Sequence, residues 1–151
     1  MATFLSSVLI EAPVAAVFAF HEREDALALL SPPFPPVLVL RRDGGIEVGS
    51  RVEMKIGPLH WVALHTAFEK NRLFEDNQIS GPFARWVHRH EFFDLGDATR
   101  LTDNIDYLLP GGVLVNRLFG WAVEIGLGRM FQYRHRVTKL FCERGIHENS
   151  N

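Results

Sequence analysis

The stretch that decides the fold is the last long apolar-periodic segment, WAVEIGLGRMFQYRHRVTKLF, at residues 121–141. At about 100° per residue it predicts an amphipathic helix, with charged side chains opposite an apolar sector. That sector comprises Val123, Leu127, Met130, Phe131, Val137 and Phe141. Arg134 lies in its middle, and a guanidinium that faces a core needs an acceptor or water there. We therefore expect an acidic partner for Arg134 elsewhere in the chain.

The composition fits one domain. A chain of 151 residues that is 47% hydrophobic can bury a substantial core. Its net charge of −2 lacks the basic excess of nucleic-acid-binding proteins, so we expect no nucleic-acid partner. Cys142 is the only cysteine, which excludes an intrachain disulfide and favours a cytoplasmic location. Residues 1–10 lack the features of a signal peptide, and no run approaches the ~20 apolar residues of an integral membrane segment.

The residues before the long helix predict a strand, two short helices and then six strands. Residues 4–10 suit a strand, and Pro13 suits the first turn of a helix that runs to about residue 22. A second helix covers about residues 24–30. It ends before the prolines at 32–36, because proline cannot continue a helix.

From residue 37 to residue 109, turn signals interrupt runs of about 5 to 12 residues, the spacing of an antiparallel meander. The turns are Asp43-Gly44-Gly45, Gly57-Pro58, Glu69-Lys70-Asn71, Gly81-Pro82 and Gly96-Asp97. With helices confined to the first connection and the end, the pattern favours the α+β class: a curved antiparallel sheet of seven strands with helices on one face.

The carboxy-terminal region follows Pro110-Gly111-Gly112. We expect Gly120 to divide it into a short helix at residues 113–119 and the long helix, and Gly145 to form the C-cap. The sequence thus predicts a single domain at residues 1–145 and a disordered tail at residues 146–151.

Strand alternation predicts which side chains face the helix, because successive residues point to opposite faces of a sheet. The outer face is assigned to Arg89 and Glu91, to Glu75 and Asn77, and to Thr102, Asn104 and Asp106. In residues 60–68 both phases are apolar and the phase of Trp61 is preferred, which gives four inward sets. These sets are Trp61, Ala63, His65; Phe74, Asp76, Gln78; Trp86, His88, His90, Phe92; and Leu101, Asp103, Ile105, Tyr107, Leu109. An unpaired buried polar group costs about 1–3 kcal/mol. The inward polar groups must therefore pair with one another and with Arg134, or line a wet cavity.

Several runs carry a resemblance to a known superfamily. They are Ala12-Pro13 with Val17-Phe18, Phe20-His21-Glu22-Arg23, Phe74-x-Asp76-x-Gln78 leading to Gly81-Pro82-Phe83, Trp86-x-His88-x-His90-x-Phe92, Tyr107 before Pro110-Gly111-Gly112, and Met130-Phe131-x-Tyr133-Arg134-His135. With the order of elements, they resemble the SRPBCC superfamily of START-like lipid-transfer domains, birch-pollen-allergen-like proteins and polyketide cyclases. The nearest resemblance is to a bacterial ligand-binding branch, sometimes fused to sugar-nucleotide epimerase-like proteins. The resemblance implies a helix-grip fold, in which the sheet wraps the last helix around a cavity for a small, largely apolar ligand.

The candidate site is the inward polar set. We expect the ligand to contact His65, Asp76, Gln78, Trp86, His88, His90, Asp103, Tyr107, Met130 and Arg134. His88 and His90 share one face of a strand, so a zinc or iron site could be drawn with His65, Asp76 or Asp103. A hydrogen-bonded network explains the same residues, and we expect neither a metal nor a cofactor. Arg134 is expected to pair with Asp76 and Asp103, holding the helix against the sheet or anchoring a polar ligand group. We interpret His21 as a packed or rim histidine.

Two functions fit these residues. The first is a binding protein for a small hydrophobic or amphipathic molecule, with the His, Asp and Arg residues orienting its polar end. The alternative is a cyclase/dehydratase-type enzyme with His88, His90 and Asp103 as acid–base candidates. A protein-interaction module with a filled cavity is a third interpretation. Ligand identity and oligomeric state stay open, with a dimer among the alternatives.

Overall fold

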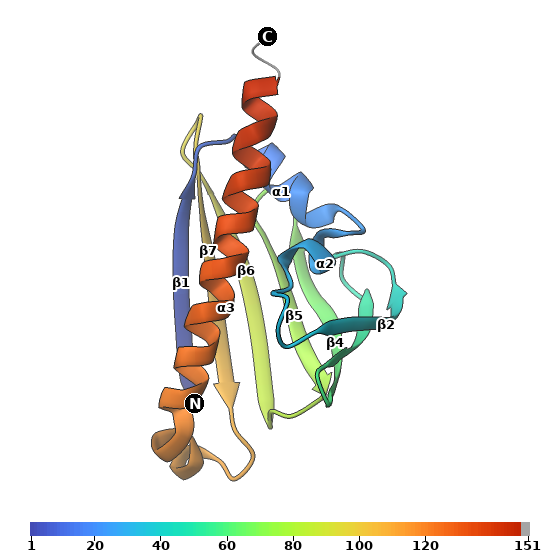
Figure 1. Cartoon of the computed structure of the whole chain (residues 1–151), viewed down its shortest axis with the longest axis vertical. Coiled ribbons are helices and arrows are strands. Elements are labelled where there is room, and N and C mark those ends of the chain that lie inside the picture. Colours follow the sequence, from blue (N-terminus) through green and yellow to red (C-terminus); the bar gives the residue numbers. More distant parts are fainter. Residues whose placement is uncertain (149–151) are drawn as a thin grey trace.

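The computed structural model describes residues 1–148, with the side chains of residues 1–144. Its centre is a seven-stranded antiparallel sheet in the order β1-β7-β6-β5-β4-β3-β2 (Figure 1). The strands are β1 (Ala2–Ile10), β2 (Val37–Asp43), β3 (Arg51–Ile56), β4 (Leu59–Glu69), β5 (Leu73–Ser80), β6 (Arg85–Asp94) and β7 (Thr99–Leu108). Strands β2 to β7 form the predicted meander, and β1 closes its far edge by pairing with β7.

Two short helices follow β1, as predicted. Helix α1 (Val14–Glu22) begins directly after Pro13, whose carbonyl accepts the backbone N–H of Ala16 at 3.0 Å. Helix α2 (Ala26–Leu30) ends at Ser31, whose hydroxyl donates to the Leu27 carbonyl at 2.6 Å. The prolines that follow lack the N–H that another helical turn would need.

Helix α3 (Val113–Glu148) is continuous, which corrects two expectations. Gly120 does not divide it, because one interior glycine costs a helix only about 1 kcal/mol and packing on the sheet supplies more than that. The helix also runs past Gly145, the predicted C-cap, and includes residues 146–148 of the predicted tail. The remainder of that tail, residues 149–151, lies outside the described residues.

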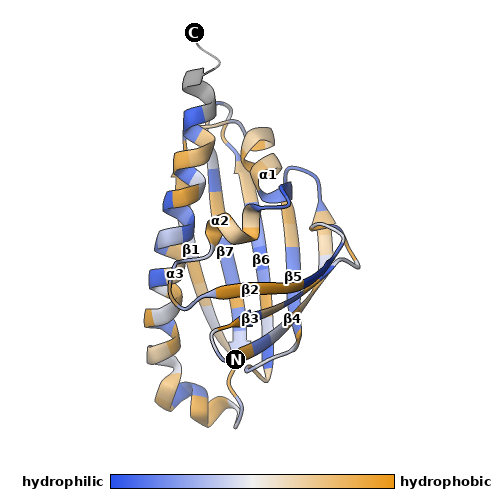
Figure 2. Cartoon of the chain, turned by 45° about the vertical axis from the view of Figure 1, so that its right-hand side comes forward, coloured by the Kyte–Doolittle hydropathy of each residue, from blue (hydrophilic) through white to orange (hydrophobic). Residues whose placement is uncertain are grey.

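The helices cover one face of the sheet, so the fold is an α+β helix-grip (Figure 1). Helix α3 runs along β1, while α1 and α2 lie over the other part of the same face and also contact α3. Figure 2 shows hydrophilic segments in the middle of β5, β6 and β7. None of the helices within residues 1–148 combines the length and the apolarity needed to cross a bilayer.

The core forms two clusters on the covered face. One cluster packs Phe18 of α1 against Phe74, Phe92 and other apolar residues, including Cys142. The other cluster includes Trp61, Trp86, Tyr107, Leu127 and Phe131. The predicted strand phases are confirmed, since His65, His88, His90 and Asp103 are all buried among these aromatic residues.

The predicted apolar sector of α3 is rotated from the buried one. The fully or nearly buried residues of this segment are Leu127, Phe131, His135, Thr138 and Cys142. Val123, Met130 and Val137 are half-buried, and the side chain of Phe141 is 41% exposed. Polar residues therefore occupy part of the inward stripe: His135 finds a partner in Asp103 on the sheet, and the Thr138 hydroxyl donates to the Arg134 carbonyl of the same helix.

Candidate functional site

The carboxylate of Asp103 on β7 is the centre of a buried histidine cluster. His88 Nε2 lies 2.8 Å from Asp103 Oδ1, and His135 Nε2 lies 2.6 Å from Oδ2. His90 Nδ1 is also 2.8 Å from Oδ1. An ionised carboxylate only accepts hydrogen bonds, so the two hydrogen-bonded nitrogens, His88 Nε2 and His135 Nε2, must carry protons.

Strand register brings these residues together. Asp76 on β5 pairs with His88 on β6, and His90 pairs with Asp103 on β7. On β4, His65 pairs with Asp76. Because residues two apart point to the same face, His88 and His90 lie side by side with ring centroids 3.7 Å apart. His135 reaches the cluster from α3, so the cluster joins the helix to the sheet.

In the cluster, the aspartate and histidine charges stabilise one another against the cost of burial. Burial alone would raise the pKa of Asp103, but His90, His135 and His88 outweigh it and hold that pKa well below its usual value. Burial would likewise lower the pKa of His90, but Asp103 and Asp76 outweigh burial and raise it. Burial and the neighbouring His90 lower the pKa of His88. The cluster therefore contains a neutral imidazole beside a more basic one, the separation of acid and base strengths on which proton transfer depends.

Two further histidines flank this cluster. His65 lies with Nδ1 3.3 Å from the Ser50 carbonyl, and burial lowers its pKa. His21 is buried with its Nδ1 2.8 Å from the Val17 carbonyl, so this nitrogen donates. Burial lowers the pKa of His21 to about 4, with a further contribution from His90. His21 is thus a packed histidine, as predicted, although its ring lies near the cluster, 6.2 Å from that of His90.

The predicted ion pair of Arg134 is not formed. Among the described residues, the partners of Asp103 and Asp76 are histidines, and Arg134 Nε is buried without a hydrogen-bond partner. The guanidinium instead lies 5.4 Å from the centre of the Phe131 ring. Burial lowers the pKa of Arg134, and Asp103 and Asp76 counteract this across a distance. Asp103 does pair with a residue of α3, as predicted from the sequence, but that residue is His135 and not Arg134.

The other predicted site residues have mainly structural contacts. Gln78 closes the β5–β6 turn, where its amide donates to the Phe83 carbonyl at 2.8 Å and accepts the Phe83 N–H at 3.1 Å. Trp86 packs edge-to-face on Trp61 at 5.1 Å between ring centroids. The Tyr107 hydroxyl donates toward Glu124 at 3.2 Å, and half-buried Met130 packs beside the same aromatic cluster.

His135 is the main residue that the sequence analysis missed. A signal was present, because the spacing of Leu127, Phe131 and His135 places all three on one helical face. Asn116 was also missed. Its side chain accepts the Leu109 N–H at 2.7 Å and donates to the Tyr107 carbonyl at 3.1 Å, which fixes the start of α3 on β7.

A cleft of about 380 Å³ lies between β1 and α3. Ser6, Ser7 and Val8 line it from β1, and its α3 wall includes Gly128, His135 and Arg136. None of the ten predicted ligand contacts lines this cleft. His135 alone connects it with the buried cluster through Asp103. A second hollow, of about 210 Å³, lies on the outer face of the sheet and includes Glu75 and Arg89.

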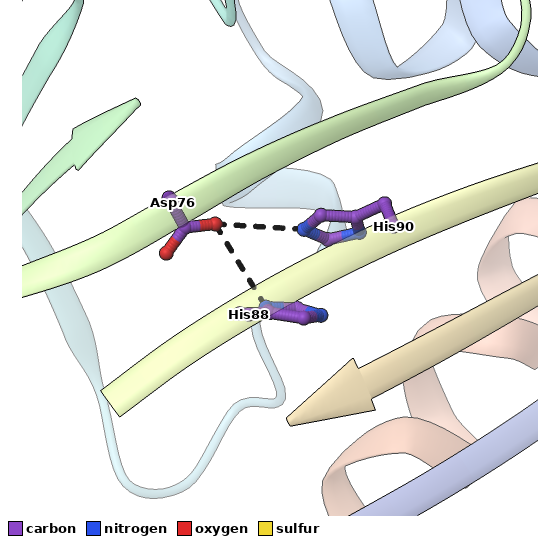
Figure 3. A group of neighbouring side chains, drawn as sticks. All are labelled: Asp76, His88 and His90. Atoms are coloured by element: carbon purple, nitrogen blue, oxygen red, sulfur yellow. Dashed lines mark ion pairs between the residues drawn. The ribbon is translucent and has the colours of Figure 1, made fainter. Parts of the chain in front are cut away.

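One part of the cluster has a donor set suited to a metal ion. Asp76, His88 and His90 each offer one ligand atom, and these atoms lie within 4.8 Å of one another. Figure 3 shows Asp76 directed at both rings. The arrangement supports two chemistries, acid–base work by an Asp-oriented histidine and coordination of a cation.

Comparisons with known proteins give one matching family and several similar structures. The family described as polyketide cyclase / dehydrase and lipid transport matches residues 10–132. No curated protein sequence matches the chain. The nucleoside-diphosphate sugar epimerase from Corynebacterium glutamicum is similar, with 27% identity over 90% of this chain and a TM-score of 0.69. The chain spans only 28% of that protein.

Two more distant structures share the fold over nearly their whole length. The Zhui aromatase/cyclase from Streptomyces sp. R1128 has a TM-score of 0.73 at 15% identity, with 96% of this chain and 95% of that chain covered. A START superfamily protein from Mycobacterium smegmatis has a TM-score of 0.66 at 16% identity, with 94% and 97% covered. These likenesses confirm the predicted helix-grip fold, and the family match over residues 10–132 confirms the predicted superfamily.

Proposed function

Because this chain belongs to the polyketide cyclase / dehydrase and lipid transport family, we propose that it binds a small hydrophobic or amphipathic molecule between the sheet and α3. The observation that carries the proposal is the cleft between β1 and α3. Its volume of about 380 Å³ falls in the range of small-molecule sites, ~300–1,000 Å³. The family alone would fit either a carrier or an enzyme.

The lining of the cleft indicates which end of a ligand it would hold. Arg136 and Lys139 contribute cationic side chains, and Ser6 and Gln132 contribute neutral polar groups. An amphipathic molecule with a carboxylate or a carbonyl group would find donors here. Its apolar part would pack against Val8 and the aliphatic stems of Arg136 and Lys139.

A glycine pair on α3 offers a matched test. Gly128 lines the cleft and Gly126 does not, and a Cβ at either position would meet no atom within 4 Å. Gly128→Phe should fill the cleft while Gly126→Phe leaves it open. Ligand binding stabilises the folded state by mass action, by about 2.7 kcal/mol at 100 Kd.

We would measure thermal stabilisation of the three proteins by long-chain fatty acids and by a polycyclic phenol. The wild type and Gly126→Phe should be stabilised by at least one of these probes, and Gly128→Phe by neither. Equal stabilisation of both variants would place binding outside the cleft. No stabilisation of the wild type by either class would contradict the proposal.

A second candidate function is supported by the pairing of His135 with Asp103. A histidine oriented by a carboxylate and placed at a cleft wall is the arrangement of a general base, so a cyclase/dehydratase-type reaction is the alternative. His135→Asn would then abolish turnover of a polyketone substrate without abolishing its binding. Turnover that is unaffected by His135→Asn and by His88→Gln would exclude this cluster as the acid–base group.

A further inference from the structure

We propose that Asp76, His88 and His90 form a binding site for a divalent transition-metal ion of the zinc or iron class. The sequence predicts a metal-free network, but three structural observations favour a metal ion: the spacing of the three donors, the contacts of Asp103 with both rings, and the partial exposure of the site. The proposal does not depend on the proposed small-molecule ligand.

The spacing of the donor atoms is too long for hydrogen bonds. Asp76 Oδ2 lies 3.6 Å from His90 Nε2 and 3.9 Å from His88 Nδ1 (Figure 3). Hydrogen bonds between nitrogen and oxygen have lengths of about 2.7–3.2 Å. Two ligands bound to one zinc ion at about 2.0–2.2 Å each lie roughly 3.3–3.6 Å apart in tetrahedral or trigonal geometry. The two distances from Asp76 therefore lie close to the separation of zinc ligands, and all three donor atoms lie within 4.8 Å of one another.

Asp103 directs both imidazoles toward this point. It accepts a hydrogen bond from His88 Nε2 at 2.8 Å, so that nitrogen carries the proton, and it lies 2.8 Å from His90 Nδ1. The opposite nitrogens, His88 Nδ1 and His90 Nε2, face Asp76. In the neutral ring of His88 the Nδ1 atom is a lone pair aimed at a carboxylate, an unfavourable contact that a cation between them would convert into an attractive one, and a cation bound at His90 Nε2 would take the place of a proton there. Metal-binding histidines commonly donate their other N–H to a carboxylate in this way.

The donor set defines the class of ion. Two imidazole nitrogens and one carboxylate oxygen suit zinc or iron(II), whereas calcium and magnesium take oxygen ligands. The site is also not sealed, because the side chains of Asp76 and His90 are 16% and 11% exposed. Three protein ligands leave coordination positions for water or for an anionic oxygen. The positive charge of half-buried Arg134, whose buried Nε has no hydrogen-bond partner, would repel the metal ion but would attract such an anion.

The test uses the full chain without a histidine tag, stripped with a chelator and titrated with zinc chloride in a calorimeter. We expect saturable binding of one zinc ion per chain. Asp76→Asn should weaken zinc binding by more than the ~10–100-fold typical of removing an outer-shell partner, and Asp103→Asn should weaken it within that range. The matched control is His60→Gln, because His60 forms an exposed pair with Glu53 at 2.8 Å on the same sheet and should not affect binding.

A spectroscopic measurement on the wild type keeps the proposal testable if Asp76→Asn does not fold. Zinc X-ray absorption should show nitrogen and oxygen ligands at about 2.0–2.1 Å with the outer-shell scattering of imidazole. No stoichiometric zinc binding by the wild type would overturn the proposal, and so would a bound zinc without imidazole ligands. Wild-type affinity in a folded Asp76→Asn variant would overturn it equally. Gly128→Phe should retain zinc, which separates this test from that of the cleft.

Discussion

Replacing Asp103 by asparagine tests whether its carboxylate holds the histidine cluster together. Asp103 is 2% exposed, and its two carboxylate oxygens contact three imidazole rings. The substitution keeps the shape but puts an NH₂ group where one acceptor oxygen was. At least one ring N–H of the cluster then faces a donor instead of an acceptor.

The expected loss can be worked from these contacts. Breaking a buried charge pair typically costs about 3–5 kcal/mol, because the remaining charge stays buried without a partner. A hydrogen bond to a charged group contributes about 1.5–3 kcal/mol, which gives the same order for the loss of His88 or His135. We therefore expect Asp103→Asn to reduce the free energy of unfolding by about 3–5 kcal/mol, a large fraction of the ~5–15 kcal/mol of an ordinary domain.

The assay is urea unfolding of chelator-treated protein, followed by the fluorescence of its three tryptophans. The control is Asp106→Asn, the same change on the outer face of β7, where Asp106 accepts from the Thr3 hydroxyl at 2.5 Å. Surface substitutions usually shift stability within about 0.5 kcal/mol. A loss below ~1 kcal/mol for Asp103→Asn, or an equal loss for both variants, would refute the claim that Asp103 organises the cluster.

Three further predictions concern residues outside the proposed metal ligands. The pKa of His21 is lowered to about 4 from 6.5, so the unfolded state binds more protons between these values and folding stability falls as pH drops from 6.5 to 4. At about 1.4 kcal/mol per pKa unit, His21→Met should remove about 3 kcal/mol of that acid-induced loss. Urea unfolding at pH 7 and pH 4 measures it, and an equal loss of unfolding free energy in the wild type and the variant would contradict the prediction. Burial raises the pKa of Cys142 to about 12, so iodoacetamide should alkylate this thiol in urea but barely in the native protein. Mass spectrometry measures the alkylated fraction, and rapid alkylation of the native protein would contradict the prediction. At Gly111 (φ +98°) a Cβ would lie 2.4 Å from Val115 Cγ2, whereas at Gly112 (φ +84°) it would meet nothing within 4 Å. Gly111→Ala should therefore lower the melting temperature more than Gly112→Ala does, and an equal loss would show that only the positive φ matters.

The inward phase of the strands could be predicted because it depends only on alternation. On β6, charged Arg89 and Glu91 belong in water, so His88 and His90 had to face the helix, and the structure has them there. The element order followed equally from local signals, such as the prolines after α2 and the glycine turns between strands. These signals act over a few residues, which a sequence displays directly.

The sequence by itself determined that aspartates and histidines share the covered face of the sheet among aromatic residues. Only the tertiary structure decided which of them pair. The rotation of α3 about its axis is set by packing along its whole length, and one residue corresponds to about 100° of that rotation. That angle brings His135 rather than Arg134 to Asp103. The convergence of Asp76 with both rings likewise depends on the register of β5 against β6, which pairs residues far apart in the chain.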